Sequence, residues 1–71
     1  MKRIPLTSSN LAAVGYDPKS KTLEVEFKNG TIYQYDHVPV DVYAELMTAE
    51  SHGSYFSKNV KNGGFAFRRI H

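Results

Sequence analysis

Residues 21–37 constrain the fold more than any other stretch, because they contain two segments of strand character joined by an Asn29-Gly30 pair. In the first segment, apolar side chains alternate with charged or polar ones, which is the pattern of an antiparallel strand buried on one face. These apolar residues are Leu23, Val25 and Phe27. Asn-Gly accepts the positive φ angles that tight hairpins require. The sequence therefore predicts a hairpin whose second strand, residues 31–37, carries Tyr33 and Tyr35 on one face.

The length of the hairpin loop decides which face of the sheet the two tyrosines take, because a slip of one residue sends every side chain to the opposite face. A two-residue loop would place Tyr33 and Tyr35 on the face of the glutamates, as an exposed platform. A three-residue loop with Gly30 as the bulge residue would instead pair Tyr33 with Val25. Tyr35 would then lie opposite Leu23, and both rings would join the core. Burial of a large aromatic side chain stabilises a protein by roughly 1.5–3 kcal/mol, more than the preference between turn types, so the sequence favours the bulged loop.

Segments on either side of the hairpin predict one more strand and two helices. Residues 11–16 are apolar and bounded by turn-forming residues, so they are predicted to form a first strand. Pro39 suits the first turn of a helix, and a second, shorter helix, capped by Ser51 or Ser54, is expected to run to about Lys61. The residues expected to face inward from the two helices are Val42, Tyr43, Leu46, Met47, Ala49, Tyr55, Phe56 and Val60.

Residues 65–70 follow an Asn62-Gly63-Gly64 stop and alternate only weakly. They form either a closing edge strand or an ordered tail, with the arginines toward solvent. The predicted fold class is α+β: a three-stranded antiparallel meander packed by two helices, with or without a short C-terminal strand. At this length, the whole chain 1–71 is expected to be a single domain.

The composition is that of an ordinary globular protein, with 41% apolar and 23% charged residues. With no cysteine, neither a disulfide framework nor a thiolate is expected. There is no apolar run at the N-terminus, so we expect a soluble cytoplasmic protein without a signal peptide or a membrane contact. The three histidines, His37, His52 and His71, lack the spacing of a metal site, and no serine has the surroundings of a nucleophile. We therefore expect no catalytic residues, metal, cofactor or small-molecule substrate.

Charge is distributed unevenly along the chain. Residues 17–50 contain all seven acids and sum to −4, whereas the two ends together sum to +6. The cations of the ends are Lys2, Arg3, Lys58, Lys61, Arg68 and Arg69. These six side chains are candidate nucleic-acid-binding residues, and they would form one basic patch if both ends met on one face. The simpler interpretation is a solvated surface with uneven charge.

The tyrosines offer a second candidate surface. They are Tyr16, Tyr33, Tyr35, Tyr43 and Tyr55. If exposed, they would form a stacking surface for bases, at about 1–3 kcal/mol per stacked base. If buried, they would fill a small core that is short of leucine and isoleucine. The sequence favours the core, with the hydroxyl groups reaching its rim.

The chain carries, in this order, Ser8-Ser9-Asn10, Gly15-Tyr16-Asp17, Leu23-x-Val25-x-Phe27, Asn29-Gly30, Tyr33-x-Tyr35, Val38-Pro39, Tyr43, Leu46, Ala49-x-Ser51-x-Gly53-x-Tyr55-Phe56 and Arg69. This order and spacing, over nearly the whole chain, resembles the KTSC domain. That small domain occurs at the C-terminal end of some lysyl-tRNA synthetases and as stand-alone bacterial and phage-encoded proteins. The chain departs from the family pattern after the second helix, where it has Gly63-Gly64 and then Phe65 and Phe67 instead of tyrosine.

The resemblance implies that Tyr16, Tyr33, Tyr35 and Tyr55 belong to a structural family motif, and it carries no catalytic residues over to this chain. The synthetase connection suggests RNA binding. The leading hypothesis is therefore an accessory module that binds RNA or tRNA through its basic C-terminal segment. The competing hypothesis is a protein-interaction module, related to phage proteins and without catalytic activity, whose sheet or helix face docks on another protein.

Overall fold

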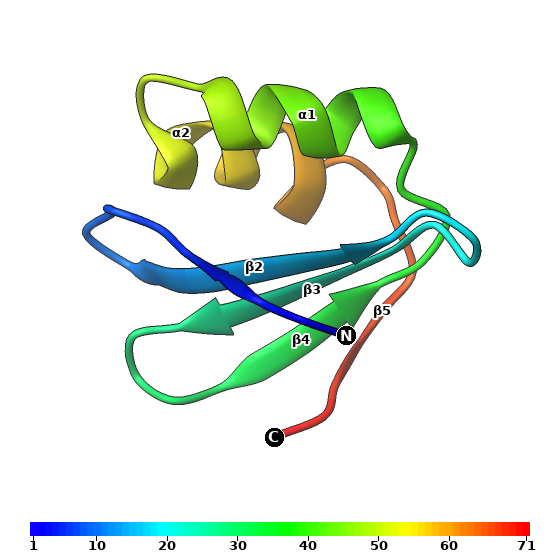
Figure 1. Ribbon diagram of the computed structural model, residues 1–71, viewed down its shortest axis with the longest axis horizontal. Helices are drawn as coiled ribbons and strands as arrows, with labels where there is room; N and C mark the ends of the chain where they lie inside the picture. The colour runs from blue at the N-terminus through cyan, green and yellow to red at the C-terminus, as the bar shows by residue number, and fades with distance from the viewer.

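Five antiparallel strands form one sheet, and the helices lie on one face of it (Figure 1). This computed structural model describes all 71 residues. The strands are β1 (Ile4–Pro5), β2 (Leu11–Asp17), β3 (Thr22–Phe27), β4 (Ile32–Tyr35) and β5 (Phe67–Arg69). They are ordered β1-β2-β3-β4-β5, so each strand pairs with its neighbour in the chain. The predicted α+β class, the meander of β2, β3 and β4 and the short closing strand are confirmed.

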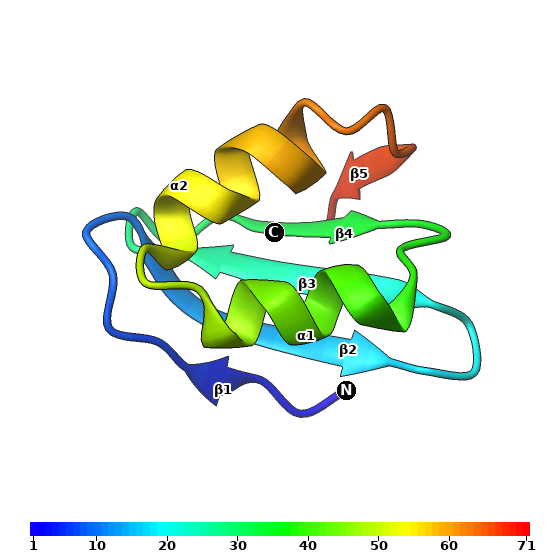
Figure 2. The same cartoon turned by 90° about the horizontal axis from the view of Figure 1, so that it is seen from above.

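β1 is an additional strand that the sequence did not predict. It has two residues, one of them Pro5, and is too short to show an alternating pattern. Proline has no N–H for a ladder, and β1 lies at an edge of the sheet, where that lack is tolerated. β5 lies at the opposite edge (Figure 2). The two cationic ends of the chain therefore lie beside opposite edges of the sheet.

The β3–β4 hairpin has the register that the sequence favoured. Tyr33 lies opposite Val25, and Tyr35 lies opposite Leu23. Gly30 takes a φ of +92°, a conformation that glycine adopts without a steric penalty. In this register, both tyrosines leave the sheet on the helix-covered face. Tyr35 is 4% exposed and therefore belongs to the core. Tyr33 is half-buried, so it is neither a full core residue nor an exposed platform.

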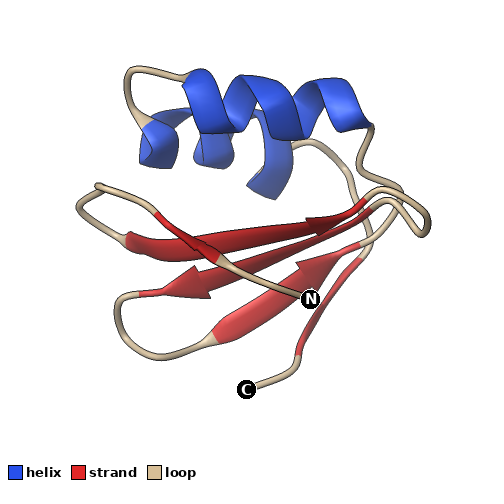
Figure 3. Cartoon of the chain, in the orientation of Figure 1, coloured by secondary structure: helices blue, strands red, loops and turns tan.

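The helical layer covers one face of the sheet, and the other face is open (Figure 3). Its elements are α1 (Val40–Thr48), α2 (His52–Phe56) and a π-helical continuation of α2, η1 (Ser57–Lys61). The Ser51 side chain caps α2 by accepting a hydrogen bond from the N–H of Ser54 at 3.2 Å. Of the two predicted caps, Ser51 is the one used, and the second helix ends at Lys61 as expected, but its second half has wider turns. None of these helices is long and apolar enough to cross a membrane.

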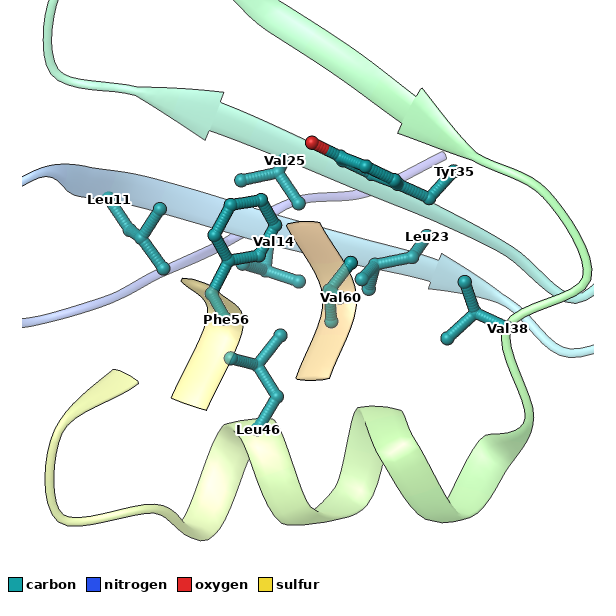
Figure 4. Close-up of a cluster of buried hydrophobic side chains, with 9 residues drawn as sticks. All are labelled: Leu11, Val14, Leu23, Val25, Tyr35, Val38, Leu46, Phe56 and Val60. Carbon is teal, nitrogen blue, oxygen red and sulfur yellow. The ribbon is translucent and has the colours of Figure 1, made fainter. Parts of the chain in front are cut away.

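The core lies between the sheet and the helices (Figure 4). It consists of Leu11, Val14, Leu23, Val25, Tyr35, Val38, Leu46, Phe56 and Val60. At one border of this core, Tyr16 stacks on Tyr43 with 4.7 Å between ring centroids. The Tyr16 hydroxyl donates a hydrogen bond to the carbonyl of Val38 at 2.6 Å. This pair therefore has the structural role that the sequence favoured for the tyrosines.

Candidate nucleic-acid interface

Aromatic rings from β3, β4, β5 and α2 form a continuous cluster between the sheet and the helices. They are Phe27, Tyr33, Tyr35, Phe56 and Phe67, and neighbouring ring centroids lie 5.5–6.5 Å apart. Such separations are favourable for aromatic pairs. Phe56 is buried, whereas Phe67 is 60% exposed. The cluster therefore reaches from the core to the surface of the protein.

A pocket of about 500 Å³ opens over this aromatic cluster. All five rings contribute to its lining, and the rest of the lining is polar: Asn10, Asn29, Thr31, Ser57, Lys61 and Asn62. These polar residues come from the position just before β2, from the β3–β4 loop and from η1 with the residue that follows it. An aromatic floor with a few polar groups and a volume within roughly 300–1,000 Å³ is typical of a small-ligand site. The pocket is therefore the candidate functional site of this domain.

Two tyrosine hydroxyls of the pocket have no hydrogen-bond partner within the protein. They belong to Tyr33 and Tyr35, which lie two residues apart on β4. Burial raises the pKa of Tyr35 above the ordinary value of 10.0, and the neighbouring Tyr33 raises it further. Tyr35 therefore keeps its proton at neutral pH and offers both a donor and an acceptor to a ligand.

The π-helical segment η1 places polar side chains on one wall of the pocket. The N–H of Asn62 donates to the carbonyl of Ser57, five residues earlier, at 3.2 Å. Ser57 and Lys61, the first and last residues of η1, both line the pocket. Such π-helical turns occur frequently at functional sites, where the wider turn redirects side chains. No signal in the sequence distinguishes this segment from an ordinary helix.

The structure separates the six predicted cationic residues into two groups. Lys61 lines the pocket, and Lys58 lies in the same helical segment. Arg69 lies opposite Tyr33 in the β4–β5 register, so its side chain leaves the sheet on the pocket side. Arg68 lies opposite Gln34 and therefore leaves β5 on the open face. Lys2 and Arg3 lie at the other edge of the sheet, just before β1.

On the open face, side chains from across the sheet form a continuous polar chain. Arg3 donates to one carboxylate oxygen of Glu24 at 2.8 Å, and the amide of Gln34 donates to the other oxygen at 2.8 Å. Arg68 donates to the side-chain oxygen of Gln34 at 2.8 Å and to the carboxylate of Asp36 at 2.8 Å. Glu24 is only 7% exposed, which fits its two partners. Two of the predicted phosphate ligands, Arg3 and Arg68, are therefore already paired with carboxylates.

Of the four motif tyrosines, Tyr33 and Tyr35 line the pocket and the other two do not. Tyr16 stacks on Tyr43 of α1. The hydroxyl of Tyr55 donates a hydrogen bond to a carboxylate oxygen of Glu45 at 3.0 Å. Sequence reasoning did not assign the remaining pocket residues to a site. They are Asn10, Phe27, Asn29, Thr31, Phe56, Ser57, Asn62 and Phe67. No group of three or more His, Asp or Glu side chains is placed to hold a metal ion.

The sequence and the fold both match one known family. The family model of the KTSC domain matches residues 7–65. A crystal structure of a KTSC domain protein from Yersinia pestis is 38% identical, with a TM-score of 0.89 over 99% of this chain and 97% of that one. The chain belongs to the KTSC domain family, which confirms the resemblance seen in its sequence motifs.

Two relatives illustrate the contexts in which this sequence occurs. A Stutzerimonas stutzeri protein, named only as an uncharacterized protein, is 43% identical over 70 residues and matches over 99% of each chain. A lysine--tRNA ligase of Nostoc sp. is 42% identical over 62 residues, which are 87% of this chain but 11% of the ligase. The chain thus corresponds to a whole small protein in one relative and to a small part of an enzyme in the other.

Proposed function

We propose that this KTSC domain binds single-stranded RNA at the aromatic pocket, with Lys58, Lys61 and Arg69 contacting phosphates. The observation that carries the proposal is the combination of an open aromatic pocket with a lysine at its rim. Bases of every kind stack on aromatic rings, at about 1–3 kcal/mol per base. Lys and Arg side chains that have no carboxylate partner are the usual ligands of the backbone phosphates.

The charges around the pocket support this proposal. The cations of the open face are neutralised by Glu24, Glu26 and Asp36, with N–O distances of 2.8–3.4 Å. Lys58, Lys61 and Arg69 form no ion pair with an Asp or Glu carboxylate. Arg69 donates one hydrogen bond, from its Nε–H to the carbonyl of His71 at 3.0 Å, and its two terminal NH₂ groups remain for a phosphate. The two charged residues of α1, Asp41 and Glu45, are both acidic. An RNA strand is therefore attracted to the β5 and η1 side of the helical layer and repelled from α1.

The similarity to part of a lysine--tRNA ligase supports RNA, including tRNA, as the class of partner. The proposed role is that of a binding module, and no residue of the pocket is assigned to a chemical step. The prediction that Lys2, Arg3 and Arg68 also contact RNA receives no support from their positions, because Lys2 and Arg3 lie at the far edge of the sheet and Arg68 is paired with Asp36.

The test is binding of a labelled single-stranded oligoribonucleotide, measured by fluorescence anisotropy over a series of salt concentrations. Each neutralised phosphate contributes about −0.7 to the slope of log affinity against log salt, so three cations predict a slope of about −2. Lys61→Ala should weaken binding and flatten the slope. Lys19→Ala, in the exposed β2–β3 turn, is the matched control and should change neither. No binding at low salt would reject the proposal.

A protein-interaction role rests on a different feature, the free outer edge of β5. This edge has no neighbouring strand, and Phe67 and Ile70 beside it are 60% and 46% exposed. Exposed strand edges can receive an added strand from a partner protein. Such a partner would bind with little dependence on salt, so the same salt series distinguishes the two functions.

A further inference from the structure

Two of the four asparagines in the chain are followed by glycine, and both of these line the pocket. They are Asn29, before Gly30, and Asn62, before Gly63. Each is also preceded by lysine, so the two sites share the sequence Lys-Asn-Gly. Asparagine is a thermolabile residue, because the backbone nitrogen of the next residue can attack its side-chain carboxamide. A following glycine has no Cβ and therefore hinders this attack least.

The reaction needs only the asparagine, its glycine and water. The glycine nitrogen loses its proton to solvent and bonds to Cγ of the asparagine, while the side-chain NH₂ takes up a proton and leaves as ammonia. The product is a cyclic succinimide. Water then opens either of its C–N bonds, which gives aspartate with the ordinary backbone or isoaspartate with the backbone running through Cβ and Cγ. Either product carries a negative charge at neutral pH where asparagine carried none.

The fold restrains the first of these sites. The side-chain oxygen of Asn29 accepts hydrogen bonds from the N–H of Thr31 at 3.0 Å and from the Thr31 hydroxyl at 2.7 Å. The attacking nitrogen, that of Gly30, donates to the carbonyl of Phe27 at 2.9 Å, an ordinary hydrogen-bond length. The N–H of Phe27 also donates to the carbonyl of Thr31 at 2.9 Å, which closes the base of the loop. Both reacting groups are therefore held in place.

The fold restrains the second site less. Asn59 donates its side-chain amide to a backbone carbonyl one turn earlier at 3.2 Å, whereas the exposed side chain of Asn62 forms no hydrogen bond within the protein. The N–H of Gly63 donates to the carbonyl of Val60 at 3.2 Å, the long end of the usual range. Residues 62–66 lie outside the helices and strands, between η1 and the edge strand β5. Such segments open more readily than the core, and each opening frees the Gly63 nitrogen.

We propose that Asn62 deamidates spontaneously in the folded protein, before Asn29 does, and that its product weakens RNA binding at the pocket. The loss of binding rests on the function proposed above, whereas the chemical step does not. The new carboxylate lies at the pocket, next in sequence to Lys61, and repels the phosphates that this lysine attracts. Isoaspartate also lengthens the backbone before Gly63, where even a Cβ would collide with the carbonyl oxygen of Asn59. The segment that leads to β5 must shift to accept it.

The chemical step is tested by keeping the purified protein in mildly alkaline buffer for increasing times and measuring the masses of its tryptic peptides. Trypsin cuts after lysine, so Asn29, Asn59 and Asn62 each begin a separate peptide. In the folded protein, the Asn62 peptide should gain the mass of deamidation first. The Asn59 peptide is an internal control, because the branched Val60 hinders the attack. In guanidinium chloride, where the fold restrains neither Lys-Asn-Gly site, Asn29 and Asn62 should convert at similar rates.

The effect on binding is tested with a labelled single-stranded oligoribonucleotide at low salt, by anisotropy, on fresh and aged protein. Affinity should fall about two- to fivefold as Asn62 converts, the size that repulsion between unit charges a few ångström apart in water produces. Asn62→Asp carries the charge from the start and should be weakened when fresh. Asn62→Gln keeps the amide, but its longer side chain closes the ring more slowly, so its affinity should survive ageing. Ser54→Asp adds the same charge at an exposed residue outside the pocket and should bind like the wild type.

The outcomes separate this inference from the proposed function. An Asn62 peptide that keeps its mass, or an Asn29 peptide that converts as fast in the folded protein, would overturn the chemical step. Unchanged affinity after conversion of Asn62 would overturn its effect on the pocket and leave RNA binding standing. Failure of fresh protein to bind RNA at low salt would reject the proposed function and the effect on binding together, while the peptide masses still decide the chemical step.

Discussion

Arg68 and Arg69 are neighbours in β5, yet their side chains leave the sheet on opposite faces. Arg68 lies opposite Gln34 and contacts Asp36 on the open face, while Arg69 lies opposite Tyr33 on the pocket side. The two residues were indistinguishable in the sequence, where both were candidate phosphate ligands. Side chains alternate between the two faces of a strand, and only the open face carries the Asp36 carboxylate, so the two arginines have different roles.

The first prediction concerns this pair. Arg69→Ala should weaken RNA binding and make its salt slope less steep by about 0.7. Arg68→Ala should leave RNA affinity unchanged. It should lower the free energy of unfolding by at most about 1 kcal/mol, because the ion pair with Asp36 is half-exposed and screened by solvent. Anisotropy and urea unfolding measure the two effects, and a loss of affinity in Arg68→Ala alone would place the RNA on the open face instead.

The second prediction concerns stability in alkali. The pKa of Tyr35 is raised above 10.0 in the folded protein, chiefly by burial. The unfolded chain therefore loses this proton at a lower pH than the folded protein does. The stabilisation is fully present below the unfolded pKa of 10.0 and is lost as the pH rises toward the folded value. Tyr35→Phe should remove this contribution, so its free energy of unfolding should fall less steeply than that of the wild type.

Urea unfolding at several values between about pH 9 and pH 11 provides the measurement. Tyr16 and Tyr55 also have raised pKa values, mainly through burial, so part of the alkaline loss should remain in Tyr35→Phe. Parallel curves for the wild type and the variant would show that Tyr35 does not contribute.

The third prediction concerns the hairpin loop. Gly30 has a φ of +92°, and no atom lies within 4 Å of the place that a Cβ would occupy, so only the backbone conformation opposes a side chain there. Gly30→Ala should cost about 1–2 kcal/mol of unfolding free energy, the usual cost of a left-handed conformation in an L-residue. Gly30→Asn should cost less, because asparagine tolerates such conformations better. Equal losses in the two variants would mean that the loop is not held in this conformation.

The fourth prediction concerns the N-terminal segment. A Cβ on Gly15 would lie 2.8 Å from the carbonyl oxygen of Lys2 and 3.1 Å from the Met1 side chain. Gly15→Ala should therefore displace residues 1–5, including β1, from β2. Amide hydrogen exchange should become faster around Ile4, which pairs with Val14. Exchange in the central strand β3 should remain slow. Unchanged exchange around Ile4 would show that the segment adapts without leaving the sheet.

The register of the β3–β4 hairpin could be predicted, although β4 (Ile32–Tyr35) is shorter than the predicted strand 31–37. Two local signals competed there, the turn preference of Asn29-Gly30 and the burial of Tyr33 and Tyr35, and burial is the larger energy. The sequence did not decide between a strand and a tail for β5, because residues 65–70 alternate only weakly. Its pairing with β4 also depends on contacts between residues far apart in the chain, such as Arg68 with Gln34. β1 was not predicted, because two residues are too few to show the alternation of apolar and polar side chains that marks a strand.

The candidate site was predicted in part. Tyr33 and Tyr35 were placed on the correct face, and Lys61 was among the proposed cations. The pocket itself depends on the π-helical turn of η1 and on the distance between η1 and β5, neither of which has a signal in the sequence. The Ser8 hydroxyl donates to the side-chain oxygen of Asn10, a contact that no residue pattern in the sequence encodes.

The polar chain from Arg3 to Asp36 has a consequence for the two edge strands. β1 has two residues and β5 has three, too few for backbone pairing alone to select one alignment. A slip of either strand by one residue would turn Arg3 or Arg68 away from its carboxylate. It would leave one oxygen of the nearly buried Glu24, or the side-chain oxygen of Gln34, without a partner. The side-chain contacts of the open face therefore add to the backbone hydrogen bonds that align the two edge strands.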